Sequence, residues 1–177
     1  MAKSRGLGDV YKRQVYSQPC QDQPPHIADV LNEQWMSMYP DGAFHPEQKV
    51  NRAQLATILV KAFDIGKRKV IHDDIITVTD VPDSHWAYPA IQTMLLHKIM
   101  KGYRDNLFYP DHAVTRVEGY AIAAQAFGVL PFEETYIEET LSQYSDSDDI
   151  PTWARKALAT AIHEGWINNK SNIEEKT

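Results

Sequence analysis

The chain has 177 residues, of which 43% are hydrophobic and 24% charged, enough for one ordinary domain or a short array of repeats. Its net charge of −6 argues against a nucleic-acid partner or an acidic membrane surface, because proteins that bind phosphates usually carry a basic patch. The apolar runs span only a few residues, far short of the roughly 20 that a membrane-spanning helix needs, so no membrane insertion is expected. The single cysteine, Cys20, excludes an internal disulfide.

Residues 1–25 match neither of the repeats described below. Residues 1–14 contain charges and glycines but no apolar segment, so they are no signal peptide. The stretch 6–14 resembles a non-native leader that recurs at the ends of open reading frames from assembled sequence data. We expect 1–25 to be a leader and linker, non-native or disordered, and any export signal to lie outside this sequence.

Apolar residues at helical spacing predict six helices along the remaining chain. The fourth, 115–127, is richer in alanine than its counterpart 51–63, which would let helices approach closely. For the third helix, Asp83 or Ser84 is the expected N-cap. The predicted helices are 26–38, 51–63, 83–100, 115–127, an insertion over 132–144, and a helix that Trp153 opens.

One sequence pattern occurs twice, at a constant offset of 64 residues. Residues 39–46 and 50–54 return as 103–110 and 114–118, both times as a turn followed by a helix start. Such an echo indicates a repeated supersecondary unit. At the turn, Asn106 replaces Gly42, and asparagine is the next most tolerant residue of a left-handed backbone, so both turns should share one geometry.

A third copy of the unit begins near the C-terminus. Residues 153–162 mirror 86–95, with the two tryptophans 67 residues apart. The chain ends before the second helix of this copy could begin. The domain boundaries that follow are 26–65 for repeat 1, 66–130 for repeat 2, and 131–177 for an insertion helix plus an incomplete repeat 3.

The motifs of the second copy resemble the S-layer homology repeat. They are Asp-x-x-x-x-His-Trp-Ala from Asp80, Gly-Tyr-x-Asp from Gly102, Phe-x-Pro from Phe108 and Val-Thr-Arg-x-Glu from Val114. The resemblance covers about 26–169, with a divergent first helix in repeat 1. It implies an all-α fold in which three repeats form a three-pronged pseudo-trimer, each with a short helix and a longer central helix.

The same resemblance implies a function. Such modules belong to exported bacterial proteins of the cell wall, S-layer or cell envelope, and anchor them to anionic, often pyruvylated, wall polysaccharide in grooves between prongs. The resemblance implies that the motif arginines, Arg52 and Arg116, hold the sugar. The other candidate groove residues, for which packing is the alternative reading, are Trp86, Trp153, Tyr39 and Tyr103.

An arginine in the first turn of a helix needs an explanation. A cation there faces the positive end of the helix dipole, which costs about 0.3–1 kcal/mol. A planar donor fork beside free N-terminal amides would suit a carboxylate ligand. An ion pair of the arginine with Asp41 or Asp105 in the preceding turn is the alternative.

Four residues around these arginines have a structural explanation instead. Thr115 and Glu118 have the spacing of a capping box, in which each side chain bonds the backbone N–H of the other residue. Asn51 and Gln54 offer the same reciprocal pair. We predict that all four cap helices.

No motif in the sequence indicates catalysis. The histidines lack metal-binding spacing, and residues 146–151 lack the glycine and terminal glutamate of a calcium loop, so they should be a solvated turn that caps the Trp153 helix. No nucleophile–base motif is present, and the glutamates of 133–139 lie on a polar face. We expect no enzyme activity, metal or cofactor.

Two alternatives remain for the function. The chain could be a helical scaffold that binds protein in the envelope, or the targeting part of an envelope hydrolase whose catalytic domain lies outside this sequence. In each case, two central helices without a third would leave an apolar stripe uncovered, which favours self-association.

Overall fold

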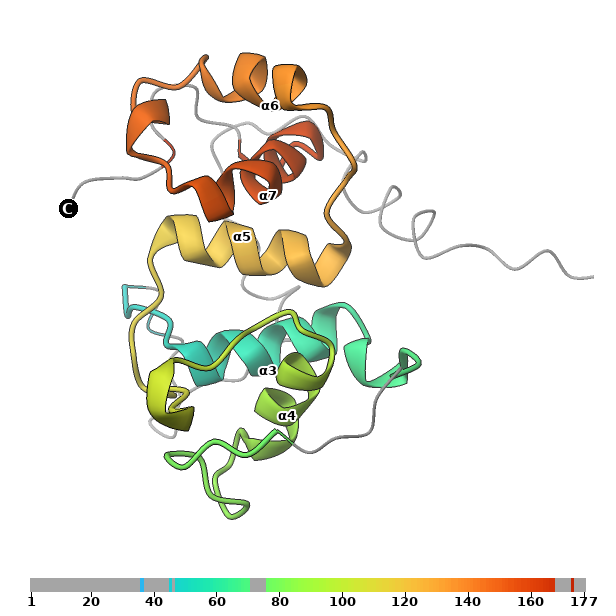
Figure 1. Ribbon diagram of the computed structural model, residues 1–177. Helices are drawn as coiled ribbons and strands as arrows, with labels where there is room; N and C mark the ends of the chain where they lie inside the picture. The colour runs from blue at the N-terminus through green and yellow to red at the C-terminus, as the bar shows by residue number, and fades with distance from the viewer. Residues whose placement is uncertain (1–35, 37–44, 46, 71–75, 168–172, 174–177) are drawn as a thin grey trace, which may run out of the picture.

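The computed structural model describes residues 36, 45, 47–70, 76–167 and 173 (Figure 1). The described part is all-α, as predicted, with five α-helices, three short 3₁₀ turns and no β-strand. The predicted helix over 26–38 lies outside the described residues. The elements are α3 (Arg52–Ala62), η1 (Ile65–Lys67), α4 (Tyr88–Leu96), η2 (Arg104–Asn106), α5 (Arg116–Phe127), α6 (Glu134–Leu141), η3 (Ser147–Asp149) and α7 (Thr152–His163).

The two longer repeat helices, α3 and α5, begin where their capping boxes place them. Asn51 Oδ1 accepts the Gln54 N–H at 2.8 Å, and Gln54 Oε1 accepts the Asn51 N–H at 3.0 Å. Thr115 and Glu118 make the same reciprocal pair at 3.2 and 2.9 Å. Each box satisfies donors that a helix start otherwise leaves without a partner, so local sequence fixes these boundaries.

The short helix α4 differs from its prediction. It begins at Tyr88, after Ala87, and neither Asp83 nor Ser84 caps it, so the N-cap prediction was wrong. The acidic residue with a structural role in this segment is Asp80. Its carboxylate accepts the backbone N–H groups of Phe108 at 2.8 Å and Tyr109 at 2.6 Å. A carboxylate that holds two amides of a distant loop cannot be recognised from helix-start signals, because its partners lie 28 and 29 residues away.

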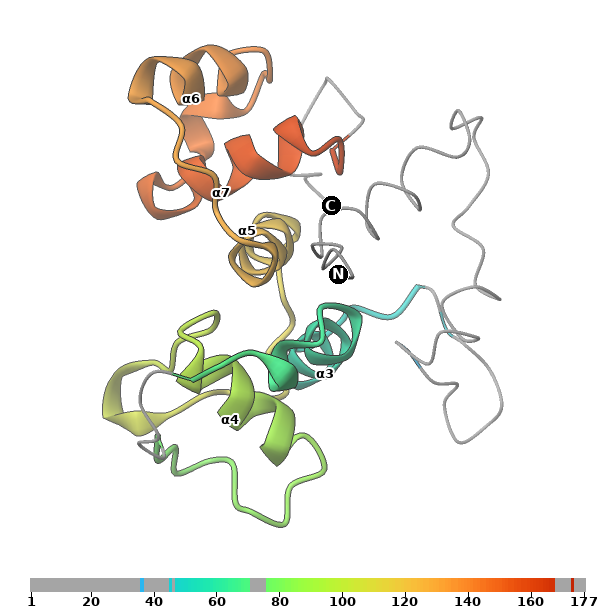
Figure 2. The same cartoon turned by 90° about the vertical axis from the view of Figure 1, so that its right-hand side faces the viewer.

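The helices pack in pairs that cross the sequence repeats. The long helix α3 of repeat 1 packs on the short helix α4 of repeat 2, and α5 of repeat 2 packs on α7 of repeat 3. Figures 1 and 2 show α3 and α4 on one side of α5 and α6 and α7 on the other. A repeat in the sequence is therefore not a packing unit in the fold.

The contact between α5 and α7 is made by small residues. Ala121 and Ala124 on α5, and Ala154, Ala157 and Ala161 on α7, are all buried. Residues spaced three or four apart line one side of a helix, and alanines there allow the two backbones to approach closely. The alanine content of α5 led us to expect close helix packing, but it did not indicate α7 as the partner, and Ala123 and Ala126 belong instead to the cluster of α3 and α4.

Helix α5 also connects the two hydrophobic clusters that the described residues form. Ala126 belongs to the cluster of α3 and α4, whereas Val117 belongs to that of α6 and α7. At the end of α5, the Phe127 ring meets Phe63 edge-on at 6.5 Å and Trp166 at 5.3 Å between ring centroids. The two clusters therefore share one helix and one aromatic side chain.

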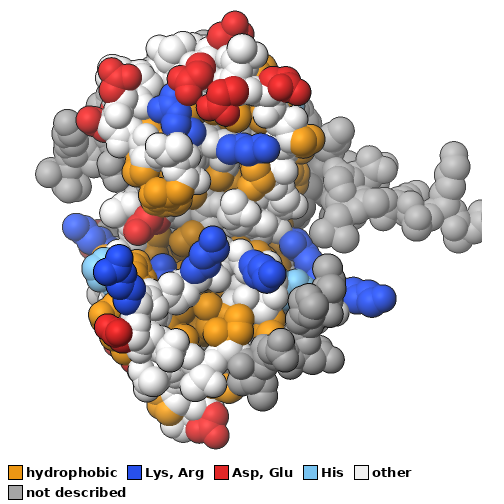
Figure 3. Space-filling model, in the orientation of Figure 1, with side chains coloured by type: hydrophobic (Ala, Val, Ile, Leu, Met, Phe, Trp, Pro, Cys, Tyr) orange, Lys and Arg blue, Asp and Glu red, His pale blue; other side chains and the backbone are white. Residues whose placement is uncertain are grey.

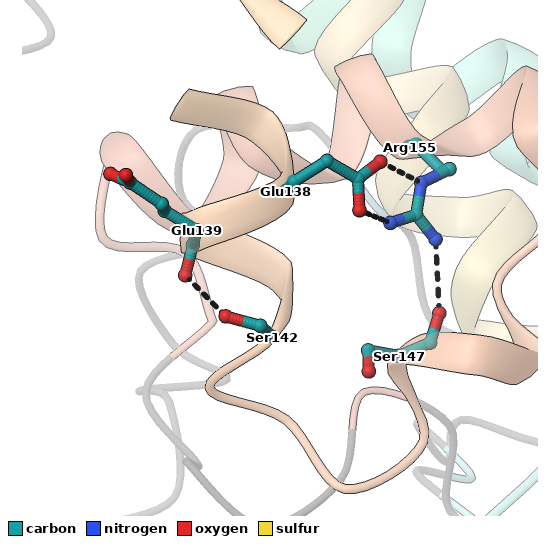
Figure 4. Close-up of polar contacts among 5 residues, drawn as sticks. All are labelled: Glu138, Glu139, Ser142, Ser147 and Arg155. Carbon is teal, nitrogen blue, oxygen red and sulfur yellow. Dashed lines mark hydrogen bonds and ion pairs between the residues drawn. The ribbon is translucent and has the colours of Figure 1, made fainter. Parts of the chain in front are cut away.

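The predicted insertion helix, α6, is fastened to α7 by an arginine (Figure 4). Arg155 donates from Nε and Nη2 to the two carboxylate oxygens of Glu138, at 3.2 and 2.6 Å, and from Nη1 to the Ser147 carbonyl at 3.1 Å. Glu138 is thus a structural ion-pair partner, and Arg155 ties α6, η3 and α7 together.

Repeat 3 copies a feature of repeat 2. Asp146 accepts the backbone N–H of Ile173 at 2.8 Å, as Asp80 accepts that of Phe108, and Ile173 and Phe108 are both fully buried. Residues 146–151 form a turn with exposed Asp148 and Asp149, as expected, but the expectation that this turn caps the Trp153 helix was wrong, since α7 starts after Pro151 without a side-chain cap. Asp146 is instead the structural equivalent of Asp80.

The described residues supply two long repeat helices, so the three-pronged arrangement stays a prediction. Self-association also stays a prediction: Leu55 and Ile58 on α3 and Ile122 on α5 are only half-buried, but no large apolar side chain of these two helices is fully exposed. None of the described helices has the length and apolar character to cross a membrane.

Candidate functional site

A groove of about 410 Å³ opens where the 98–103 loop meets α5 and α7. It therefore lies where the predicted repeats 2 and 3 meet. In Figure 1 this loop crosses the near face of the molecule below α5. The groove is lined by Arg52, Lys98, Ile99, Met100, Lys101, Gly102, Tyr103, Glu118, Ala121, Ile122, Gln125, Trp153 and Ala157.

Helix α5 supplies one wall and α7 the other. The α5 residues of the groove recur at helical spacing over two turns, from Glu118 to Gln125, and so lie on one face. On α7, Trp153 is in the first turn and Ala157 follows one turn later. Trp153 is 62% exposed, which leaves most of its indole available to a ligand.

The third wall is the loop that carries Tyr103. A β-carbon at Gly102 would lie 3.1 Å from the Leu107 carbonyl oxygen, so glycine permits the close approach there. The Tyr103 N–H donates to that same carbonyl at 2.7 Å and closes the turn. Within it Asp105 and Asn106 are left-handed, as the sequence predicted for Asn106, and Tyr103 is 46% exposed.

Arg52 lies at the base of this loop, and the reason for its place in the sequence is structural. It is only 7% exposed. Its Nε donates to the Phe108 carbonyl at 2.9 Å, its Nη2 donates to the Lys101 carbonyl at 2.8 Å, and the guanidinium lies 4.5 Å from the Phe108 ring centroid. The arginine thus joins repeat 1 to the loop of repeat 2 and needs no ion pair with Asp105.

The free helix amides expected beside Arg52 are absent from the described start of α3. The Arg52 N–H donates to the His112 carbonyl at 3.0 Å, the Ala53 N–H to the Pro110 carbonyl at 2.9 Å, and the Gln54 N–H to Asn51. All three first-turn donors are satisfied. A carboxylate bound by these amides, as the sequence hypothesis had it, is therefore excluded at α3.

One nitrogen of Arg52 remains for the groove. Neither of its hydrogen bonds uses Nη1, which has no partner within the part of the chain that the structure describes. Burial lowers the pKa of the guanidinium, while Tyr103 and Glu118 act in the opposite direction. An arginine pKa is so high that the group stays charged all the same.

The groove has a positive balance of charge. Arg52, Lys98 and Lys101 line it, against the single carboxylate of Glu118, which also receives the Thr115 N–H in the capping box. Figure 3 shows Lys and Arg side chains in a row across the middle of this face, and acidic side chains gathered at the top, over α6. An anion is therefore attracted to the middle of a molecule whose net charge is negative.

Three of the six predicted ligand residues come together in the groove: Arg52, Tyr103 and Trp153. Trp86 is equally exposed, at 62%, but stacks on His85 outside the groove. Arg116 is half-buried with its guanidinium 5.7 Å from the Tyr120 ring centroid, and does not line the groove. Tyr39 lies outside the described residues.

The sequence reasoning missed three polar residues of the groove: Lys98, Lys101 and Gln125. For Lys98 a signal existed, since the offset of 67 that relates the two tryptophans also relates Lys98 to Gly165. The other two carry no local signal. Within the described ranges, no group of three or more His, Cys, Asp or Glu side chains could hold a metal ion.

The fold and the groove together define a class: an all-α repeat module with an open aromatic and cationic groove where two repeats meet. Residues 25–56 and 79–118 match the family model of the S-layer homology domain. The chain therefore carries S-layer homology repeats, as the motifs predicted.

Relatives with known names agree with this assignment. A "Cellulosome-anchoring protein" of Acetivibrio thermocellus is 29% identical over 85% of the chain and 33% of its own length. The "Surface-layer 125 kDa protein" of Lysinibacillus sphaericus is 28% identical over 75% of the chain and 11% of its own length. "Exoglucanase XynX" of Acetivibrio thermocellus is 29% identical over 75% and 12%. The chain thus spans a third or less of these relatives, and the predicted cell-envelope location is confirmed.

Proposed function

We propose that the chain anchors a protein to the cell wall by binding an anionic polysaccharide in the groove between α5 and α7. The observation that carries the proposal is the meeting of Trp153, Tyr103 and three cationic side chains in one open groove. Sugar rings present C–H faces that pack on exposed aromatic rings, while acidic substituents pair with cations. The composition of the groove supports both contacts at once.

The acidic group that suits this site is a carboxylate, as on a pyruvylated sugar. Nη1 of Arg52 is the fixed donor, because the other guanidinium nitrogens are held by the carbonyls of Phe108 and Lys101. A donor that is already immobilised loses little side-chain entropy on binding. Arg52 therefore acts in our proposal both as a structural link and as a ligand contact. Trp86, Arg116 and Tyr39 would belong to equivalent sites of other repeats in the three-pronged arrangement.

The proposed role is adhesion without catalysis. A relative named as an anchoring protein supports it, and a relative named as an exoglucanase shows that similar repeats also occur in an enzyme. In this role the chain would hold the protein that carries it at the wall. The alternative function is a scaffold that binds protein. A scaffold of this kind would not bind walls from which the proteins have been removed.

The test is co-sedimentation of the purified chain with deproteinised walls of Acetivibrio thermocellus and Lysinibacillus sphaericus, the sources of these relatives. We expect binding to at least one preparation, and loss of binding after hydrofluoric acid has removed the wall polysaccharide. Trp153→Ala should weaken binding about tenfold, or roughly 1.4 kcal/mol, since it removes an aromatic contact surface.

Tyr136→Ala is the matched control, because Tyr136 is an exposed aromatic of α6 outside the groove and should leave binding unchanged. Trp86→Ala tests whether a second site contributes. Failure to sediment with either wall, or sedimentation only with walls that retain their proteins, would contradict the proposal and favour the scaffold. Equal binding by Trp153→Ala would remove the groove as the site.

A further inference from the structure

We propose that Lys98 is a ligand-binding residue of the groove, kept at a backbone position where glycine would be easier to accommodate. This inference rests on the proposed function. It adds that Lys98, in the 98–103 loop that forms one wall of the groove, recognises the negative charge of the ligand. It starts from the backbone at the end of α4.

Lys98 terminates α4 in a left-handed conformation. Its φ is +56°, its N–H donates to the Leu95 carbonyl at 2.9 Å, and the Ile99 N–H donates to the Met94 carbonyl at 3.0 Å. This pair of bonds is the Schellman motif, whose left-handed residue is usually glycine because a β-carbon is unfavourable there.

Helix α7 ends in the same motif with the expected residue. Gly165 has a φ of +74°, its N–H donates to the Ile162 carbonyl at 3.0 Å, and the Trp166 N–H donates to the Ala161 carbonyl at 2.9 Å. Gly165 stands 67 residues after Lys98, the offset that relates Trp153 to Trp86. Of these two equivalent helix ends, the left-handed position is thus occupied by a lysine in repeat 2 and by a glycine in repeat 3.

The strained residue is at the groove. Lys98 lines it and is exposed, and its side chain makes no hydrogen bond or ion pair with the described residues. Its ammonium therefore contributes nothing to the packing that the structure describes. Backbone strain held at a site and unexplained by packing points to a function of the side chain. Together with Lys101 and Arg52, Lys98 makes the groove attractive to an anion, and its charge recognises the acidic group of the polysaccharide.

The substitution Lys98→Gly separates binding from folding, because the two effects have opposite signs. Relief of the strain should raise the Tm by roughly 2–4 °C. Loss of the charge should weaken binding to deproteinised walls about three- to fivefold in 50 mM salt. The difference should vanish in 1 M salt, where the screening length falls to about 3 Å. Lys98→Arg should bind like the original chain.

The matched control is Asp64→Gly. Asp64 follows α3 with a φ of +51° and lies outside the groove. Its carboxylate pairs with Lys67 at 2.8 Å, but both side chains are exposed and such a pair adds little stability, so the replacement should still raise the Tm without changing binding. If the original chain binds the walls and the Lys98→Gly variant binds them equally tightly in low salt, the inference is overturned. If the original chain itself fails to bind, the proposed function fails, and the role of Lys98 with it.

Discussion

The position of Arg52 in the first turn of α3 is explained by its long-range hydrogen bonds and not by the helix that contains it. Its charge is unfavourable at the start of α3, by about 0.3–1 kcal/mol. Two charge-assisted hydrogen bonds to carbonyls, each worth about 1.5–3 kcal/mol, outweigh that cost. The bonds connect residues 56 and 49 positions apart, so Arg52 stabilises the tertiary structure and not the helix that contains it.

The substitution Arg52→Lys tests this at the residue scale. Lysine keeps the charge but has no planar fork, so it cannot reach both carbonyls, and a buried carbonyl loses its partner. We expect the free energy of unfolding to fall by about 1–3 kcal/mol, measured by urea denaturation. Arg104→Lys, an exposed change in the neighbouring turn η2, should stay within about 0.5 kcal/mol. An unchanged unfolding midpoint for Arg52→Lys would contradict the structural role.

At the scale of elements, the helices and loops are held together by long-range hydrogen bonds and an ion pair that cannot be predicted from the sequence of each helix. Asp80 and Asp146 hold the amides of buried Phe108 and Ile173, and Arg155 fastens α6. The α6 attachment is partly exposed, since Arg155 is 18% and Glu138 55% exposed at the side chain. Solvent screening therefore limits its value to about 1 kcal/mol, in spite of the bidentate geometry.

Removal of the Glu138 charge should loosen α6 alone. With Glu138→Gln we expect amide hydrogen exchange in α6 to accelerate about fivefold, the equivalent of roughly 1 kcal/mol, while exchange in α3 stays unchanged. Glu139→Gln is the control, because only the backbone carbonyl of Glu139 takes part in the contacts of this region. Equal exchange rates in the two variants would show that the ion pair contributes nothing.

The molecule as a whole depends on α5, which belongs to both clusters. Because Phe127 contacts Phe63 on one side and Trp166 on the other, the clusters should unfold together. Phe127→Ala should then lower the stability of both, by about 2 kcal/mol, roughly half the cost of removing a fully buried phenylalanine.

The measurement is a thermal melt followed by circular dichroism and by tryptophan fluorescence. The two midpoints should coincide in the original chain and fall together in Phe127→Ala. Repeating the melt at several protein concentrations tests the predicted self-association, since a midpoint that rises with concentration indicates an oligomer. Separate midpoints for the two probes would show that α5 does not couple the clusters.

The sequence by itself determined the repeat, the family and the starts of α3 and α5, because repeats are read directly and a capping box closes within three residues. It also placed Arg52, Tyr103 and Trp153 among the candidates. Only the tertiary structure decided that α4 packs on α3 of the preceding repeat and that Asp80 accepts backbone N–H groups of a distant loop. It also decided which of the candidate residues line the same groove. Those outcomes depend on contacts across tens of residues, where packing and buried hydrogen bonds outweigh local preference.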